Sequence, residues 1–164
     1  MGAWTDHRHL APQHVEELGQ LVQACAAQEG TDASHPHVIA RDIPVQTSRG
    51  EALADLSFSG AIYASVRASD LDLAVEPEQY NELIALGREI KWALNDSAEA
   101  QFADDPRLSG VYGTILFDDL GRHENGTGGP KQRNITVFAD GEVDRSPCGS
   151  GTGARVALLA DDGT

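Results

Sequence analysis

The sequence contains few cysteines. Among its 164 residues there are two, Cys25 and Cys148, and no Cys-x-x-Cys motif. Two isolated cysteines provide neither a disulfide framework nor a structural zinc site. Each thiol therefore has to be interpreted from its own neighbours in the sequence.

Positive charge is also scarce. The chain has 12 Lys and Arg residues against 26 Asp and Glu residues, which gives a formal net charge of -14. The acidic residues are spread along the chain, so its surface repels phosphate backbones and anionic lipid. We expect no nucleic-acid partner and no membrane partner.

Long hydrophobic runs are absent from the sequence. No run reaches the roughly 18 apolar residues of a membrane-spanning helix, and the N-terminus lacks the apolar core of a signal peptide. A cytoplasmic location is expected. Hydrophobic residues nevertheless make up 40% of the chain, which is enough for one ordinary buried core.

Hydrophobic periodicity and turn residues predict an alternation of helices and strands. Helices are predicted over residues 12–27, 77–95 and 149–159. Strands are predicted over residues 38–45, 55–66, 110–117 and 134–138. Gly60 falls inside the second strand, where it indicates a bulge or a close approach of another backbone segment. Residues 121–132 are expected to form a surface loop, and residues 139–142 a turn.

The most unusual segment is Asp144-Arg-Ser-Pro-Cys-Gly-Ser-Gly-Thr-Gly-Ala-Arg155. Its proline and glycines place Cys148 in a turn at the start of a helix, where backbone N–H groups and the helix dipole favour the thiolate. The N–H groups of Gly149 and Ser150 would hold a carboxylate. Such a site suits removal of an amino acid's α-proton, because the resulting charge develops on that carboxylate.

Two residues near this segment complete the expected site. Asp144, four residues before the thiol, is a candidate to pair with a substrate ammonium or to orient the loop; the alternative is a turn or cap residue. Phe138, at the end of the preceding strand, is a candidate for an apolar wall; the alternative is an ordinary core residue.

Four segments together point to a known family. They are Arg133–Thr152, which reads RNITVFADGEVDRSPCGSGT, and the upstream stretches Asp55–Ala64, Val75–Ile90 and Leu108–Ile115. The first resembles the second-cysteine signature of the proline racemase and 4-hydroxyproline epimerase family, and the upstream stretches extend the resemblance over most of the chain.

The resemblance implies a cofactor-free racemase or epimerase that acts on proline or hydroxyproline. In this family two cysteines, one from each of two similar lobes, face opposite sides of the substrate's α-carbon. Cys148 matches the second thiol. Asp144 and the amides of Gly149 and Ser150 match residues that hold the substrate, and Phe138 matches a residue that flanks its ring.

The implied fold is an α+β lobe of the diaminopimelate-epimerase-like type, with a sheet wrapped around a central helix that begins after Cys148. That helix is expected to be largely buried, so Arg155 needs an exit to solvent or a partner. We expect residues 1–35 to be an unassigned helical segment and residues 36–164 to be a second lobe, truncated at its C-terminus. An exposed inter-lobe face would favour a homodimer.

The sequence departs from the family pattern at several positions. Ser59-Gly60 stands where many relatives have Gly-Gly, Ser150 replaces a frequent Thr, and Gly153 replaces a Ser or Cys. The family's first signature, a Cys-Gly-His motif, does not occur in the sequence, and Cys25 lies in a helical run among alanines. Racemisation needs an acid and a base on opposite faces, so this chain alone is expected to have little or no racemase activity.

Two other functions remain open at this point. Dehydration of trans-3-hydroxy-L-proline also begins with removal of the α-proton, but no second thiol has to return one. A dehydratase is therefore the main alternative. The other is an inactive family remnant that serves as a binding or structural domain.

Other patterns in the sequence carry weaker signals. Residues 149–154 formally fit a dinucleotide-binding motif, although no strand leads directly into them. Cys148 with His123 would form a hydrolase pair. A divalent metal would be bound by N-terminal residues drawn from Asp6, His7, His9, His14, His35 and His37. Histidines in a tail are usually solvated, so neither a metal nor a cofactor is expected.

Overall fold

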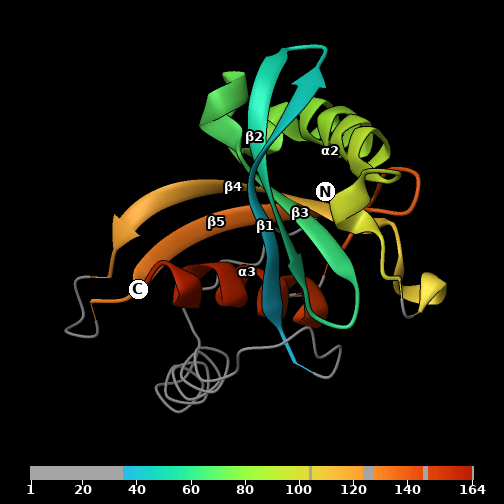
Figure 1. The fold of residues 1–164 in the computed structure, drawn as a ribbon. Helices are drawn as coiled ribbons and strands as arrows, with labels where there is room; N and C mark the ends of the chain where they lie inside the picture. Colours follow the sequence, from blue (N-terminus) through green and yellow to red (C-terminus); the bar gives the residue numbers. More distant parts are fainter. Residues whose placement is uncertain (1–34, 104, 124–127, 146–147, 164) are drawn as a thin grey trace.

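The computed structural model describes residues 35–103, 105–123, 128–145 and 148–163. Within these ranges the chain forms a six-stranded mixed sheet with two helices (Figure 1). The helices are α2 (Tyr80–Leu94) and α3 (Gly149–Asp161). The strands are β1 (His37–Thr47), β2 (Gly50–Phe58), β3 (Ile62–Arg67), β4 (Val111–Arg122), β5 (Pro130–Phe138) and β6 (Glu142–Val143). The predicted α+β class is confirmed, and the predicted helix over 12–27 lies outside the described residues.

The strands lie in the sheet in chain order, and all neighbours pair antiparallel except β3 and β4. A parallel pair needs a crossover connection, because both strands start at the same end. Here the crossover contains α2 and short 3-10 turns at Ala68–Leu71, Pro77–Gln79, Ala98–Ala100 and Pro106–Leu108. The starts of β3 and β4 are thereby adjacent, and Tyr63 pairs with Gly113.

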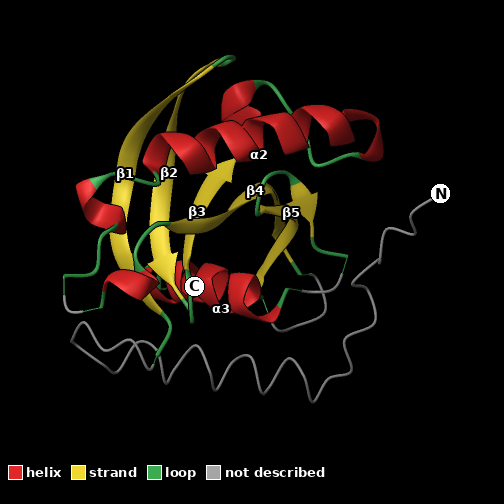
Figure 2. Ribbon diagram, turned by 90° about the vertical axis from the view of Figure 1, so that its right-hand side faces the viewer, coloured by secondary structure: helices red, strands yellow, loops and turns green. Residues whose placement is uncertain are grey.

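The sheet lies between the two helices, as Figure 2 shows. Large apolar side chains fill the space on the α2 side, in a cluster that includes Leu56, Ile62, Val66, Leu83 and Ile90. Each such side chain contributes roughly 1.5–3 kcal/mol when fully buried. A smaller cluster of Tyr63, Ile115 and Ala154 lies on the α3 side. Side chains alternate along a strand, so β3 supplies residues to both sides.

Two of the predicted element boundaries need correction. The chain does not continue as one strand over residues 55–66; it turns after Phe58 and returns as β3, with Phe58 paired to Ile62. Gly60 has a φ of 76°, which glycine adopts without steric penalty, so it serves a turn and not a bulge. The predicted loop over 121–132 is shorter, because β4 extends to Arg122 and β5 begins at Pro130.

The helix α3 is buried along one side only, which corrects the expectation that it is largely buried. A single sheet face covers one stripe of a helix. The buried residues are Gly151, Ala154, Arg155, Ala157 and Leu158. Gly149, Ser150 and Asp161 are exposed.

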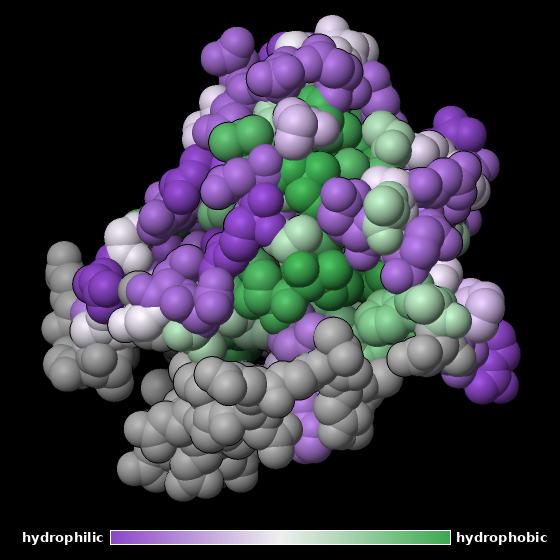
Figure 3. All heavy atoms as spheres, viewed as in Figure 1, coloured by the Kyte–Doolittle hydropathy of each residue, from purple (hydrophilic) through white to green (hydrophobic). Residues whose placement is uncertain are grey.

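The outer surface combines polar and apolar areas. On the face in Figure 3, hydrophobic residues gather toward the centre and hydrophilic residues surround them. Among the residues that the structure describes, the exposed large hydrophobic side chains are Leu53, Tyr80, Trp92, Tyr112 and Leu120. In the described part of the chain, neither helix has the length and apolar character needed to cross a bilayer.

Two departures from the family pattern meet in the structure. Ser59, in the turn between β2 and β3, faces Gly153 on α3, and a Cβ atom at position 153 would clash with the Ser59 side chain. The resemblance implies a smaller glycine at position 59 and a larger serine or cysteine at position 153. The two changes therefore compensate each other in volume.

This compensation predicts a coupling between the two positions. In a Ser59→Gly background, Gly153→Ala should raise the free energy of unfolding by about 0.8–1 kcal/mol, because alanine favours helix over glycine. In the parent chain the clash with Ser59 opposes that gain, so the same substitution should not stabilise. Urea unfolding of the four proteins measures the coupling. Equal effects of Gly153→Ala in both backgrounds would contradict the contact.

Candidate active site

Cys148 occupies a strained position at the start of α3. It is the N-cap residue, with φ 49° and ψ 78°, in the left-handed region. A residue with a Cβ atom held there stores roughly 1–3 kcal/mol, and such strain is concentrated at functional sites. Cys148 is partly buried and forms no disulfide. The thiol is therefore held in place by the fold while remaining reachable from solvent.

A buried tyrosine lies beside the thiol. The Tyr63 hydroxyl is 4.0 Å from Sγ of Cys148 and 2.7 Å from Oγ of Ser150. Tyr63 is fully buried. This burial is the main cause that raises the pKa of Tyr63 to about 12; the Ser150 hydrogen bond opposes the shift and Cys148 adds to it. Tyr63 is thus a neutral hydroxyl at physiological pH.

An aromatic wall connects Phe138 to this tyrosine. Phe138 stacks on Tyr112 with ring centroids 5.9 Å apart, and Tyr112 meets Tyr63 edge-on at 5.7 Å. Tyr112 is 50% exposed, so the wall reaches the surface. Gly113 permits this packing, because a Cβ there would lie 3.2 Å from Cβ of Phe138 and 3.4 Å from Cε1 of Tyr63.

Thr136 and Gly151 form the floor beneath the thiol. A Cβ atom at Gly151 would lie 2.9 Å from Sγ of Cys148 and 3.5 Å from Oγ1 of Thr136. A larger residue at 151 would therefore displace the thiol. The N–H of Asp144 donates to the backbone carbonyl of Thr136 at 3.3 Å, which joins the segment before Cys148 to β5.

The first turn of α3 is open in front of the thiol. Gly149 and Ser150 are exposed, and a Cβ atom added to Gly149 would meet no atom within 4 Å. The first N–H groups of a helix have no carbonyl partner within it, and the helix dipole is positive there. This geometry can accept a carboxylate at the two positions that the sequence predicts.

The structure thus brings Cys148, Gly149, Ser150 and Phe138 around Tyr63, while Asp144 is joined to the same region through β5. Their contacts with a substrate remain predictions. Sequence reasoning missed Tyr63 and Tyr112 as site residues. A signal was present, because both lie in segments that resemble the family, but nothing local indicates which side of a strand faces the thiol.

Two other interpretations of the sequence are wrong. Residues 149–154 are not a dinucleotide-binding turn: α3 already begins at Gly149, and Gly151 and Gly153 lie inside it against Cys148 and Ser59. His123 does not pair with Cys148. It follows the far end of β4, where its N–H donates to Gly129, roughly 30 Å along the strand from Gly113.

The metal hypothesis falls largely outside the described residues, which exclude Asp6, His7, His9 and His14. Of the described pair, Nδ1 of His37 lies 2.9 Å from the backbone carbonyl of His35. Across the described ranges, no three His, Cys, Asp or Glu side chains are grouped to hold a metal ion.

Comparison with known proteins decides the family. The family model for proline racemase matches residues 21–164. The chain belongs to the proline racemase family. Among its members, a trans-3-hydroxy-L-proline dehydratase from Colwellia psychrerythraea is 42% identical over 122 residues, which cover 74% of this chain and 33% of that protein. A 3-hydroxyproline 2-epimerase from Burkholderia multivorans is 40% identical over 124 residues, which cover 75% of this chain and 36% of that protein.

A solved structure supports the same membership. The crystal structure of a hydroxyproline epimerase from Agrobacterium vitis, with bound trans-4-hydroxy-L-proline, matches with a TM-score of 0.66 and 32% sequence identity. The match covers 78% of this chain and 35% of that chain. This member of the proline racemase family therefore spans about one third of the length of the relatives it matches.

The raised pKa of Tyr63 predicts that its phenol ionises at a higher pH than an exposed tyrosine. The folded pKa lies above the unfolded value of 10.0, so the neutral phenol stabilises the fold below about pH 10 and this contribution is lost as the pH rises toward 12. The loss is on the order of 2–3 kcal/mol. Ultraviolet titration of the three tyrosines should show one phenol that ionises at a higher pH than the other two, and Tyr63→Phe should remove this high-pH step. If all three phenols ionise over the same pH range in the folded parent, the Tyr63 hydroxyl is not buried as the structure has it.

Proposed function

We propose that this chain carries one of the two proton-transfer centres of a proline or hydroxyproline racemase or epimerase, with Cys148 as the acid/base thiol. The observation that carries the proposal is the position of the thiol: it caps α3 beside an open helix N-terminus, 4.0 Å from the Tyr63 hydroxyl. Membership of the proline racemase family supports it. The described sheet and α3 would form one lobe, in which the sheet wraps around α3.

In the proposed reaction, the substrate carboxylate lies on the N–H groups of Gly149 and Ser150. The Cys148 thiolate removes the α-proton and becomes a thiol, while the charge left on carbon spreads onto the bound carboxylate. Asp144 pairs with the substrate ammonium. Phe138 flanks the ring of the substrate.

Tyr63 has a positioning role in this proposal. Its hydroxyl holds the Ser150 side chain at 2.7 Å, which keeps the first turn of α3 in register with the thiol. Inversion at the α-carbon also requires a proton from the opposite face. In the family pattern a second thiol on another lobe delivers that proton.

Exchange of the α-hydrogen in D₂O tests the role of Cys148. A single thiol removes a proton and returns a deuteron to the same face, so trans-4-hydroxy-L-proline should lose its α-proton NMR signal with little or no inversion. Cys148→Ser should lower the exchange rate by about 100-fold or more, and Cys25→Ser, the matched control, should not. Exchange that persists in Cys148→Ser, or rapid inversion by the chain alone, would count against the proposal.

Alkylation measures binding separately from turnover. Iodoacetamide labelling of Cys148 should slow when trans-4-hydroxy-L-proline occupies the site. Pyrrolidine, which has the ring and the ammonium but no carboxylate, should protect far less, because the helix N-terminus has no anion to hold.

A trans-3-hydroxy-L-proline dehydratase is the second candidate function. The Colwellia relative with this activity in its name is 42% identical over the aligned residues. Dehydration removes the proton from the α-carbon and the hydroxyl from the adjacent carbon, and these leave as water. The resulting enamine becomes a cyclic imine, and no second thiol has to reprotonate the α-carbon from the opposite face.

Incubation with trans-3-hydroxy-L-proline separates the candidates. A dehydratase should produce a cyclic imine that o-aminobenzaldehyde traps, and Cys148→Ser should abolish it. The control substrate, trans-4-hydroxy-L-proline, should give none, because its hydroxyl is not adjacent to the α-carbon. Exchange at the α-carbon without imine would favour the epimerase, and protection of Cys148 without turnover would identify a binding domain.

A further inference from the structure

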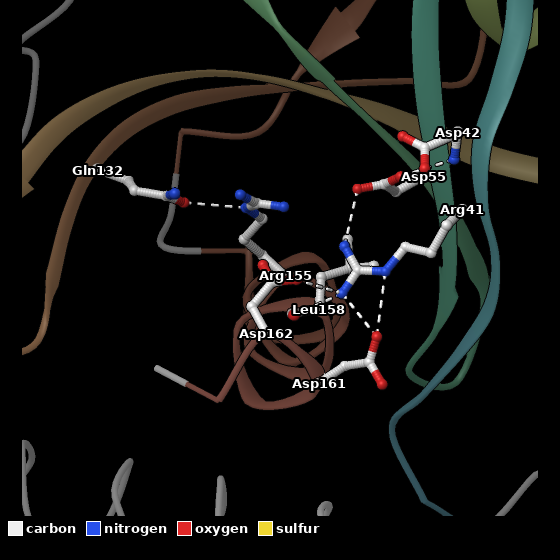
Figure 4. Close-up of polar contacts among 8 residues, drawn as sticks. All are labelled: Arg41, Asp42, Asp55, Gln132, Arg155, Leu158, Asp161 and Asp162. Atoms are coloured by element: carbon white, nitrogen blue, oxygen red, sulfur yellow. Dashed lines mark hydrogen bonds and ion pairs between the residues drawn. The ribbon is translucent and has the colours of Figure 1, made fainter.

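Arg155 on α3 is a buried cation without a counter-ion among the described residues. It is 7% exposed. One face of its guanidinium stacks on Phe117, at 3.8 Å from the ring centroid, and Nε donates to Oε1 of Gln132 at 2.9 Å. A guanidinium has five N–H donors, and the bond to Gln132 uses the one on Nε. Figure 4 shows the remaining nitrogens of Arg155 without a contact among the residues drawn.

Two further arginines join Arg155 around a cavity of about 250 Å³. Arg67 ends β3 and Arg122 ends β4. Arg67 pairs with Phe117 on the parallel strand β4, and Arg122 lies five residues further along β4; both side chains line the cavity. Arg67 also lies over the Phe117 ring, at 5.4 Å from the centroid.

The acids that line the cavity are already engaged. Asp119 pairs with Arg67 at 3.5 Å, and Asp162 pairs with Arg41 at 2.9 Å. Figure 4 shows Arg41 also bonded to Asp55 and Asp161. Neither lining acid forms an ion pair with Arg155 in the structure.

The charge of the lining favours a singly charged anion. Three arginines and two aspartates line the cavity, which leaves one positive charge in excess, although the whole chain carries -14. Burial is the main cause that lowers the pKa of Arg155 to about 10; the charges of Asp55 and Asp162 oppose the shift without reversing it, and Arg41 and Arg67 add to it. A buried charge of this kind is costly unless a partner pairs with it.

We propose that this cavity binds a carboxylate, held by the terminal nitrogens of Arg155 and flanked by Arg67 and Arg122. The planar guanidinium matches a carboxylate through two parallel hydrogen bonds. A single carboxylate neutralises the excess charge, whereas a phosphate dianion would reverse it. Arg155 lies seven residues after Cys148, roughly 10 Å along the helix axis, so this site does not use the substrate position at Cys148.

Acetate serves as the probe, in thermal unfolding at constant ionic strength set with chloride. The parent should show a saturable rise in melting temperature, of roughly 5 °C at ten times the dissociation constant. Arg155→Lys keeps the positive charge but loses the two parallel N–H donors of the guanidinium, so this variant should bind acetate at least tenfold more weakly. Arg67→Gln and Arg122→Gln change exposed residues, so they test the site even if Arg155→Lys does not fold.

The matched control is Arg107→Gln. It removes the same charge from a side chain that is 89% exposed and, among the described residues, forms an ion pair with nearby Asp105, so its acetate response should equal that of the parent. The proposal is overturned if acetate and chloride act alike on the parent while the parent stays monomeric. It is also overturned if the Arg67 and Arg122 variants respond to acetate as the parent does.

Sedimentation equilibrium distinguishes two sources of the carboxylate. If it belongs to an Asp or Glu of a second copy, the parent should form dimers that acetate dissociates and that Arg155→Lys does not form. If it belongs to a small free acid, the parent should remain monomeric while acetate raises its melting temperature. Either result supports the carboxylate site.

Discussion

The hydrogen bond between the buried Tyr63 hydroxyl and Ser150 is the constraint on which the candidate site depends. A phenol that is completely buried needs a hydrogen-bond partner, since an unsatisfied one costs about 1–3 kcal/mol. Ser150 is that partner at 2.7 Å, on the first turn of α3. The bond therefore fixes the start of α3 against β3, and Cys148 takes its left-handed conformation two residues earlier. Gly151 completes the arrangement, because it leaves the space that Sγ occupies.

The two sides of the sheet have different roles for a physical reason. The α2 side is packed with large aliphatic residues, as expected for the main source of stability. The α3 side has a small core, and it holds the buried hydroxyls of Ser57 and Ser65, which have no hydrogen-bond partner among the described residues. This side also carries the two candidate sites, the thiol at the N-terminus of α3 and the Arg155 cavity further along the helix.

The parts of the fold that depend on local periodicity could be predicted from the sequence, and those that depend on distant contacts could not. The helix over 77–95 and the helix start after Cys148 follow from spacing and turn residues, and α2 and α3 agree with them. The turn at Gly60 was missed, since apolar residues on both sides look like one continuous strand. Tyr63 is 85 residues from Cys148, and no local pattern shows that they meet. Local reasoning about the turn and helix start supplied the other candidate site residues, the family resemblance agreed with them, and the structure brings them to the same region.

The proposed chemistry is compatible with relatives whose names carry different reactions. The Colwellia dehydratase and the Burkholderia epimerase match the chain at 42% and 40% identity over nearly equal lengths. Both reactions begin with removal of the α-proton, and a thiol at the start of α3 would perform that step in either. They differ in what happens next on the substrate: return of a proton from the opposite face, or loss of a hydroxyl from the adjacent carbon. In this proposal the segment around Cys148 supplies the shared first step, and residues that approach the opposite face of the substrate select the outcome.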